Sequence, residues 1–93
     1  MRMADRIETK LRDALAPARL EVHDDSHKHE GHAGARPGGE THFRVVAVAA
    51  AFEGKSRVAR QRMIYAALAE EMQERVHALQ LTTLTPEEEA QRR

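Results

Sequence analysis

Histidine is concentrated in one part of this sequence. Five of the six histidines lie between His23 and His42, most of them in the segment DDSHKHEGHAG, and the sixth is His77. Neutral imidazole is the commonest protein metal ligand, and a glycine-rich loop lets several rings converge. The spacing is irregular and matches no zinc module with paired ligands. Two interpretations therefore stay open, a metal-binding loop and a polar loop exposed to solvent.

His77 stands apart from the other histidines. It follows a long helical pattern and precedes the alternating run ALQLTTL, at the end of an apolar stripe. A single histidine in such a place is most often structural, because an imidazolium is favoured near a helix C-terminus. Its position alone thus favours a structural role over a ligand role.

A second cluster is basic and lies in the segment GKSRVARQR. Its members are Lys55, Arg57, Arg60 and Arg62. The backbone N–H groups of a helix N-terminus favour phosphate, so this turn is suited to DNA or RNA. No aromatic residue lies in the cluster to stack on a base, and GKS lacks the glycine-rich stretch of a Walker loop. The alternatives are a solvated basic face and a docking surface for an acidic partner.

The composition argues against an enzyme and against a membrane protein. There is no cysteine, and neither Ser26 nor Ser56 has the sequence context of an activated nucleophile. The formal net charge is zero, so any electrostatic footprint must be local. No apolar run approaches the ~18 residues that a membrane span needs. We expect a non-enzymatic, cytoplasmic protein.

Hydrophobic periodicity predicts the elements that carry these clusters. A helix is expected before Pro17, with an apolar stripe of Met3, Ile7, Leu11 and Leu15. Leu20 and Val22 indicate a short strand, and a loop without periodicity follows at about 24–40. The stretch from Thr41 to Phe52 predicts a second strand, which can pair antiparallel with the first.

The second half of the chain continues the alternation of helix and strand. A long helix is expected from about Arg57 to Arg75, with Glu70, Glu71 and Glu74 solvated. Its apolar stripe consists of Ile64, Leu68, Met72 and Val76. Residues 78–84 predict a third strand, and a short C-terminal helix is expected at about 85–91 with Thr85 as its cap. The sequence thus predicts one α+β domain over residues 1–93 with the order α-β-β-α-β-α.

Four segments, taken together, resemble the BolA family. They are LEVHDDSHKH, GETHFRVVAV, FEGKSRVARQRMIYAALAEEM and HALQLTTLTPEE. The resemblance runs from about Ile7 to Glu88 in one collinear order. It implies a fold like a type II KH domain with a helix-turn-helix feature, which agrees with the order of elements above.

The resemblance also implies a partner and a cofactor. BolA-like proteins pair with monothiol glutaredoxins as heterodimers and share a bridging 2Fe–2S cluster, to which the glutaredoxin side brings a cysteine and glutathione. Carried over, His77 in HALQL is one ligand and His32 in EGHAGARPGGETHF is the other, with His29 and His27 as alternates because the loop is about one residue longer than in relatives. The chain is thus similar to the histidine-type members. Alone, we expect it to hold no stable cluster and to be a monomer or weak dimer.

Some BolA-like proteins are also described as DNA-binding transcriptional regulators. By this resemblance, the four residues of the basic cluster would contact phosphate, with modest and salt-sensitive affinity because the net charge is zero. The first expectation is therefore a role in iron–sulfur cluster handling or iron-dependent regulation. The alternative is a stress- or morphology-type DNA-binding regulator.

Overall fold

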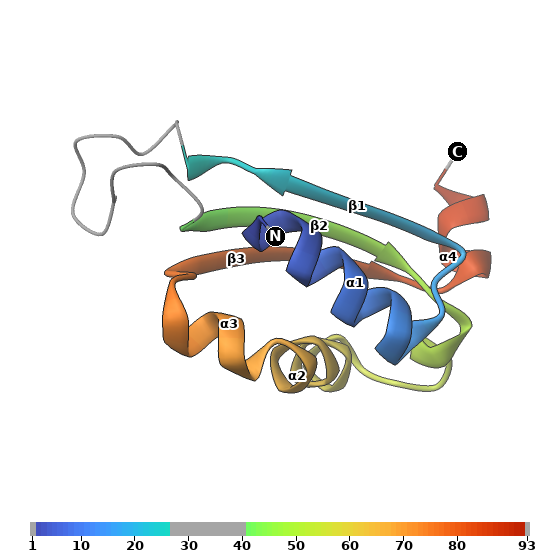
Figure 1. The fold of residues 1–93 in the computed structure, drawn as a ribbon. Coiled ribbons are helices and arrows are strands. Elements are labelled where there is room, and N and C mark those ends of the chain that lie inside the picture. Colours follow the sequence, from blue (N-terminus) through green and yellow to red (C-terminus); the bar gives the residue numbers. More distant parts are fainter. Residues whose placement is uncertain (1, 27–40, 93) are drawn as a thin grey trace.

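The fold has two layers, a three-stranded sheet and helices packed on one of its faces (Figure 1). It is seen in a computed structural model that describes residues 2–26 and 41–92. Within these residues the order is α1 (Met3–Leu15), β1 (Arg19–Asp24), β2 (His42–Val48), α2 (Arg57–Ala67), α3 (Ala69–Glu74), β3 (Ala78–Leu84) and α4 (Pro86–Gln91). This confirms the predicted α+β class and the alternation of elements.

The sheet has the order β1-β2-β3, with β1 antiparallel and β3 parallel to β2. Every second residue of β2 points into the helical layer, so Phe43, Val45 and Ala47 are buried. The stripe of α1 packs on them, since its four predicted residues are all buried in the same core as Ile64 and Leu68. The antiparallel pairing of β1 and β2 is as the sequence predicts.

The second strand is shorter than predicted. It ends at Val48, and Ala50–Phe52 form a 3-10 turn in which the Phe52 N–H donates to Ala49 O at 3.1 Å. Phe52 then lies fully buried in the core instead of extending the strand. Gly54 completes the reversal at a φ of 75°, a conformation that glycine adopts without steric cost.

The long helix is not continuous. It breaks at Leu68, whose φ of −105° and ψ of 19° leave the helical range, and α3 begins at the next residue. Leu68 and Val76 both lie in the core, as members of the predicted apolar stripe. Glu71 of α3 is fully buried, so the expectation that Glu71 is solvated is wrong.

The Glu71 carboxylate is buried, and two cations of α1 neutralise it. Arg6 and Lys10 each lie within 3.0 Å of it. Desolvation acts to raise the pKa of Glu71, but the hydrogen bonds from Lys10, the backbone and Arg6 outweigh it and hold the pKa below its usual value. This ion-pair cluster joins the first helix to the third.

Candidate functional site

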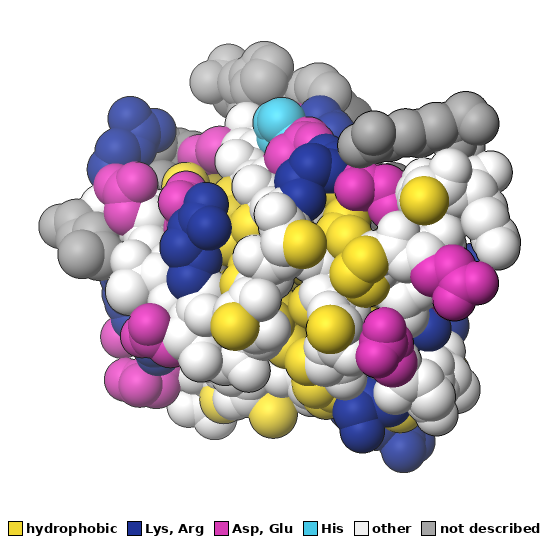
Figure 2. All heavy atoms as spheres, turned by 90° about the vertical axis from the view of Figure 1, so that its right-hand side faces the viewer, with side chains coloured by type: hydrophobic (Ala, Val, Ile, Leu, Met, Phe, Trp, Pro, Cys, Tyr) yellow, Lys and Arg dark blue, Asp and Glu magenta, His cyan; other side chains and the backbone are white. Residues whose placement is uncertain are grey.

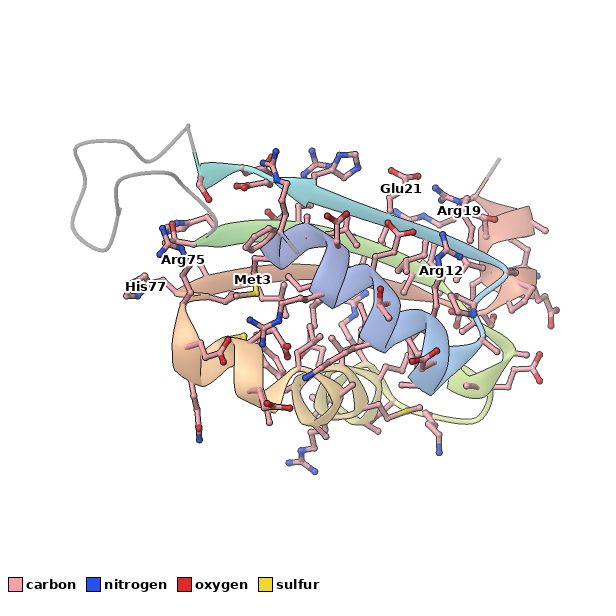
Figure 3. The ribbon with its side chains drawn as sticks, viewed as in Figure 1. Met3, Arg12, Arg19, Glu21, Arg75 and His77 are labelled. Carbon is pink, nitrogen blue, oxygen red and sulfur yellow. The ribbon has the colours of Figure 1, made fainter. Side chains whose placement is uncertain are left out.

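The parallel pairing of β2 and β3 determines where His77 lies. His77 immediately precedes β3, and its backbone N–H donates to the carbonyl of Thr41, the residue before β2, at 2.7 Å. The side chain of His77 is exposed and projects from the end of the sheet (Figure 3). The isolated histidine of the sequence is thus beside the point where the histidine-rich loop enters β2.

The two described ends of that loop are joined by Ser26. Its buried hydroxyl accepts hydrogen bonds from the N–H groups of Thr41 and His42, at 2.9 and 3.1 Å. The Asp24 carboxylate in turn accepts the Ser26 N–H at 2.9 Å. This network fixes both ends of the loop next to His77. In the sequence, Ser26 is notable only as a possible nucleophile, and no local signal points to this hydrogen-bonding role.

Among the histidines that the structure describes, His42 is the one that lies beside His77. Their ring centroids are 6.3 Å apart, and the rings are tilted by 31°. The Nδ1 atom of His42 lies 2.8 Å from Thr41 Oγ1, a contact that orients the ring. The parallel register, which aligns His42 with Ala78, is the reason for this proximity. No signal in the sequence specified that register.

The other histidines divide into two groups. His23 lies on β1, where its Nε2 is 3.0 Å from Glu21 Oε1, so its described contact is with the sheet and not with His77. His32, His29 and His27, the predicted loop ligand and its alternates, lie outside the described residues. Over residues 2–26 and 41–92, no three histidine or acidic side chains form a metal-binding group. An exposed imidazole at a loop base is nevertheless a suitable iron ligand once further donors are supplied.

The basic cluster lies at the opposite end of the sheet. Ser56 begins α2, accepting the Ala59 N–H on its hydroxyl at 3.1 Å. Lys55, Arg57 and Arg62 are exposed around this turn. Three of the four predicted phosphate-binding residues are therefore accessible.

Arg60 departs from that prediction. Its side chain is only 11% exposed, and its guanidinium donates to Glu88 at 2.7 and 3.1 Å and to the carbonyl of Thr83 at 3.1 Å. The hydrogen bonds that Glu88 accepts from Arg60 and from the Thr85 N–H lower the pKa of Glu88 to about 2. Arg60 thus connects α2 to α4. Its guanidinium already donates to Glu88 and Thr83, so it is not available to bind phosphate as predicted. The sequence did not indicate this ion pair, because an acidic residue at Glu88 is already explained by the capping of α4.

The surface around this end carries both signs of charge. Figure 2 views the molecule from the right-hand side of Figure 1, and on that face basic and acidic side chains surround a central apolar area. The charge on this face is therefore mixed and local, in line with the zero formal net charge.

None of the helices that the structure describes is long and apolar enough to cross a bilayer.

The architecture defines a class, a small α+β domain whose parallel β2–β3 pair brings His77 beside Thr41 and His42. A sequence model described as BolA-like protein matches residues 11–88, and the chain belongs to the BolA family. It is 48% identical over 88 residues to the DNA-binding transcriptional regulator BolA of Escherichia coli (strain K12), covering 95% of this chain and 80% of that protein. It is 50% identical over 80 residues to BolA-like protein 1 of Homo sapiens, covering 86% and 56%.

Solved structures and a larger relative agree with this assignment. The BolA domain of SufE1 from Arabidopsis thaliana superposes with a TM-score of 0.83 at 45% identity, covering 91% of this chain and 93% of that one. BolA1 from the same plant gives a TM-score of 0.81 at 41% identity, with the same coverage. The chain spans 24% of the SufE-like protein 1 and 56% of the human relative, so it matches only part of these proteins.

Proposed function

We propose that this chain pairs with a monothiol glutaredoxin and contributes imidazole ligands to a bridging 2Fe–2S cluster. The observation that carries the proposal is the hydrogen bond between the His77 N–H and Thr41 O, which joins His77 to the base of the histidine-rich loop. His77 would be one ligand and His32 the other, with His29 and His27 as alternates. When bound, the cluster supplies a redox centre whose potential is raised where imidazole replaces thiolate.

The described residues have two tasks in this proposal. The parallel β2–β3 register and the Ser26 hydrogen bonds keep the residues on either side of 27–40 beside His77, which supports a ligand shell shared between His77 and a histidine of that segment. The ring centroid of His42 lies 6.3 Å from that of His77, so His42 is a neighbour of the proposed ligand. Since the chain has no cysteine, the thiolates must come from the partner.

Reconstitution tests the proposal directly. The chain is mixed with a monothiol glutaredoxin, glutathione, iron and sulfide, and the visible absorption and circular dichroism of the heterodimer are measured. We expect His77→Ala and His32→Ala to change the spectrum, with His23→Ala as a matched control that leaves it unchanged. Unchanged spectra for both variants would refute the ligand assignment, while a change with His29→Ala or His27→Ala alone would transfer it to an alternate. The absence of any coloured heterodimer would refute the function.

DNA binding is the second candidate, and it is favoured by the exposed cations at the start of α2. The Escherichia coli relative carries a DNA-binding name. The helix-turn-helix and type II KH-like descriptions stay predictions here, because α2 and α3 meet at Leu68 without the turn of 3–4 residues typical of a helix-turn-helix.

Salt titration distinguishes this candidate. If α2 binds duplex DNA, Arg57→Ala and Lys55→Ala should each weaken binding and reduce the salt slope by ~1. Arg60→Ala should act mainly by destabilising the fold, because Arg60 is bonded to Glu88. If the chain does not bind duplex DNA at low salt, DNA binding is refuted as its function.

A further inference from the structure

The β3 edge of the sheet is open in the part of the chain that the structure describes. In the described residues β3 pairs only with β2, so its other edge carries no strand. The carbonyl of Leu84 accepts from the Ala49 N–H on the β2 side, at 2.9 Å. Because alternate peptide groups of a strand point to opposite edges, those of Leu79, Leu81 and Thr83 point outward.

Two of these outward carbonyls are already engaged by α2. Tyr65 Oη lies 3.5 Å from the carbonyl of Leu79, and Arg60 donates to that of Thr83. Leu81 lies midway between them, and its peptide group has no hydrogen-bond partner among residues 2–26 and 41–92. An outward N–H and C=O at this position form a template on which another strand can pair.

The same edge is the floor of a cleft between α2 and α4. Two hollows of about 690 and about 240 Å³ share Arg57, Thr83, Leu84 and Arg92, so they form one continuous depression. Leu81 lies in the floor of the smaller one, and Gln61 and Gln91 add amide side chains to the walls. Glu88 and Gln91 of α4 line the larger hollow, and α4 lies on the right-hand side of Figure 1.

The cleft is strongly biased toward positive charge. Four basic side chains line it, Lys55, Arg57, Arg60 and Arg92, against the single carboxylate of Glu88. That carboxylate is already neutralised by Arg60. Three exposed cations therefore remain to attract an acidic ligand. This is a local field on a protein whose formal net charge is zero.

We propose that this cleft binds an extended, acidic segment of a partner protein, which adds to β3 as a further strand. Peptide groups of the segment pair with Leu81, and its acidic side chains contact Arg57 and Arg92. A peptide fits better than a nucleic acid, because the floor is a strand edge and no aromatic side chain lines the cleft for base stacking.

The location separates this surface from the proposed cluster site. Leu81 lies four residues from His77 along β3, a path of about 13 Å at the usual rise per residue, and the larger hollow lies beyond it toward α4. The proposed segment and a ligand at His77 would therefore contact different residues. The inference does not depend on the proposed function.

The test uses the full-length chain, labelled for NMR, and a short synthetic peptide of alternating threonine and glutamate. At low salt we expect saturable binding, with amide hydrogen exchange at Leu81 slowed by ~10-fold or more on addition of the peptide. The exchange rates of β1 amides should change little. A peptide of alternating threonine and lysine should not bind.

Charge reversal identifies the walls of the cleft. Arg57→Glu should weaken peptide binding by ~10-fold, whereas Arg62→Glu, on the same helix but outside the cleft, should change it less than ~2-fold. Thermal unfolding of each variant shows whether it is folded, and the exchange measurement on the unmodified chain needs no variant.

Several outcomes would overturn the proposal. One is no peptide binding at millimolar concentration, and another is equal weakening by Arg62→Glu. Unchanged exchange at Leu81 would show that no strand is added. Tighter binding of a short oligothymidylate at the same residues would make the cleft a nucleic-acid site instead. Self-association of the chain through this edge would make the occupant a second copy.

Discussion

The hydroxyl of Ser26 satisfies two backbone N–H groups, those of Thr41 and His42, where the chain re-enters the sheet. Thr41 is completely buried, so water cannot replace the lost acceptor there. His77 hydrogen-bonds to the same Thr41 peptide unit through its carbonyl. The Ser26 side chain therefore supports the backbone geometry around Thr41, His42 and His77.

Ser26→Ala should lower the free energy of unfolding by ~1–3 kcal/mol, because it leaves buried N–H groups without an acceptor. Urea denaturation measures the change. Ser56→Ala is the matched control, since Ser56 is an exposed helix cap whose loss typically costs ~1 kcal/mol. A smaller loss for Ser26→Ala than for Ser56→Ala would contradict the assigned role.

Glu71→Gln should destabilise the fold by ~2 kcal/mol, because hydrogen bonds from charged donors to a buried carboxylate are among the stronger ones. Arg6 and Lys10 would then face a neutral amide in place of their counter-charge. Glu70→Gln is the control, and we expect a loss below ~0.5 kcal/mol because its side chain is 75% exposed. Equal losses in thermal unfolding would show that burial of the charge is unimportant.

At the scale of elements, helix ends decide where the chain changes direction. Ala16 ends α1 in the left-handed conformation, at φ 45° and ψ 56°, with its N–H donating to Arg12 O. Pro17 follows, and it cannot continue the helix through a backbone N–H. The reversal that starts β1 is therefore made by an L-residue in a conformation that suits glycine better.

Ala16→Gly should stabilise the protein by ~0.5–1 kcal/mol, because glycine adopts the left-handed conformation without a steric penalty. Ala14→Gly, two residues earlier within the exposed face of α1, should instead destabilise it by a similar ~0.5–1 kcal/mol. Melting temperatures of the two variants should thus move in opposite directions. A decrease for both would show that the conformation at Ala16 is not strained.

At the scale of the whole molecule, two ion-pair systems connect distant parts of the chain. Arg6 and Lys10 join α1 to Glu71 in α3, and Arg60 joins α2 to Glu88 in α4. Both carboxyl groups have a pKa below the usual 4.5 in the folded state, and for Glu88 it is about 2. Between the folded-state and the unfolded-state pKa of each carboxyl group, the unfolded chain therefore binds more protons than the folded chain.

Stability should consequently fall as the pH falls. The contribution of both pairs is present above pH 4.5 and decreases as the pH falls below it, and for Glu88 the loss runs down to its folded-state pKa of about 2. The urea midpoint measured across this range should decrease steadily. The Glu88→Gln variant should start from a lower midpoint at neutral pH and decline less steeply. A midpoint that rises with acidification would reverse the sign of the assigned shifts.

The sequence by itself determined the elements with clear periodicity. The apolar stripe of α1 and the alternation in β1, β2 and β3 gave the observed elements, because each pattern buries one face whatever the rest of the chain does. The Thr85 cap of α4 was equally local, since the Thr85 and Glu88 side chains bond to backbone N–H groups three residues apart. The family resemblance rests on the same order of segments.

Only the tertiary structure decided how these elements meet. The break at Leu68, the burial of Glu71 and the pairing of Arg60 with Glu88 depend on contacts between residues far apart in sequence, which periodicity does not encode. The site follows the same rule. The sequence identified His77, but the parallel register of β2 and β3 placed it beside Thr41 and His42, because strand pairing is a long-range choice.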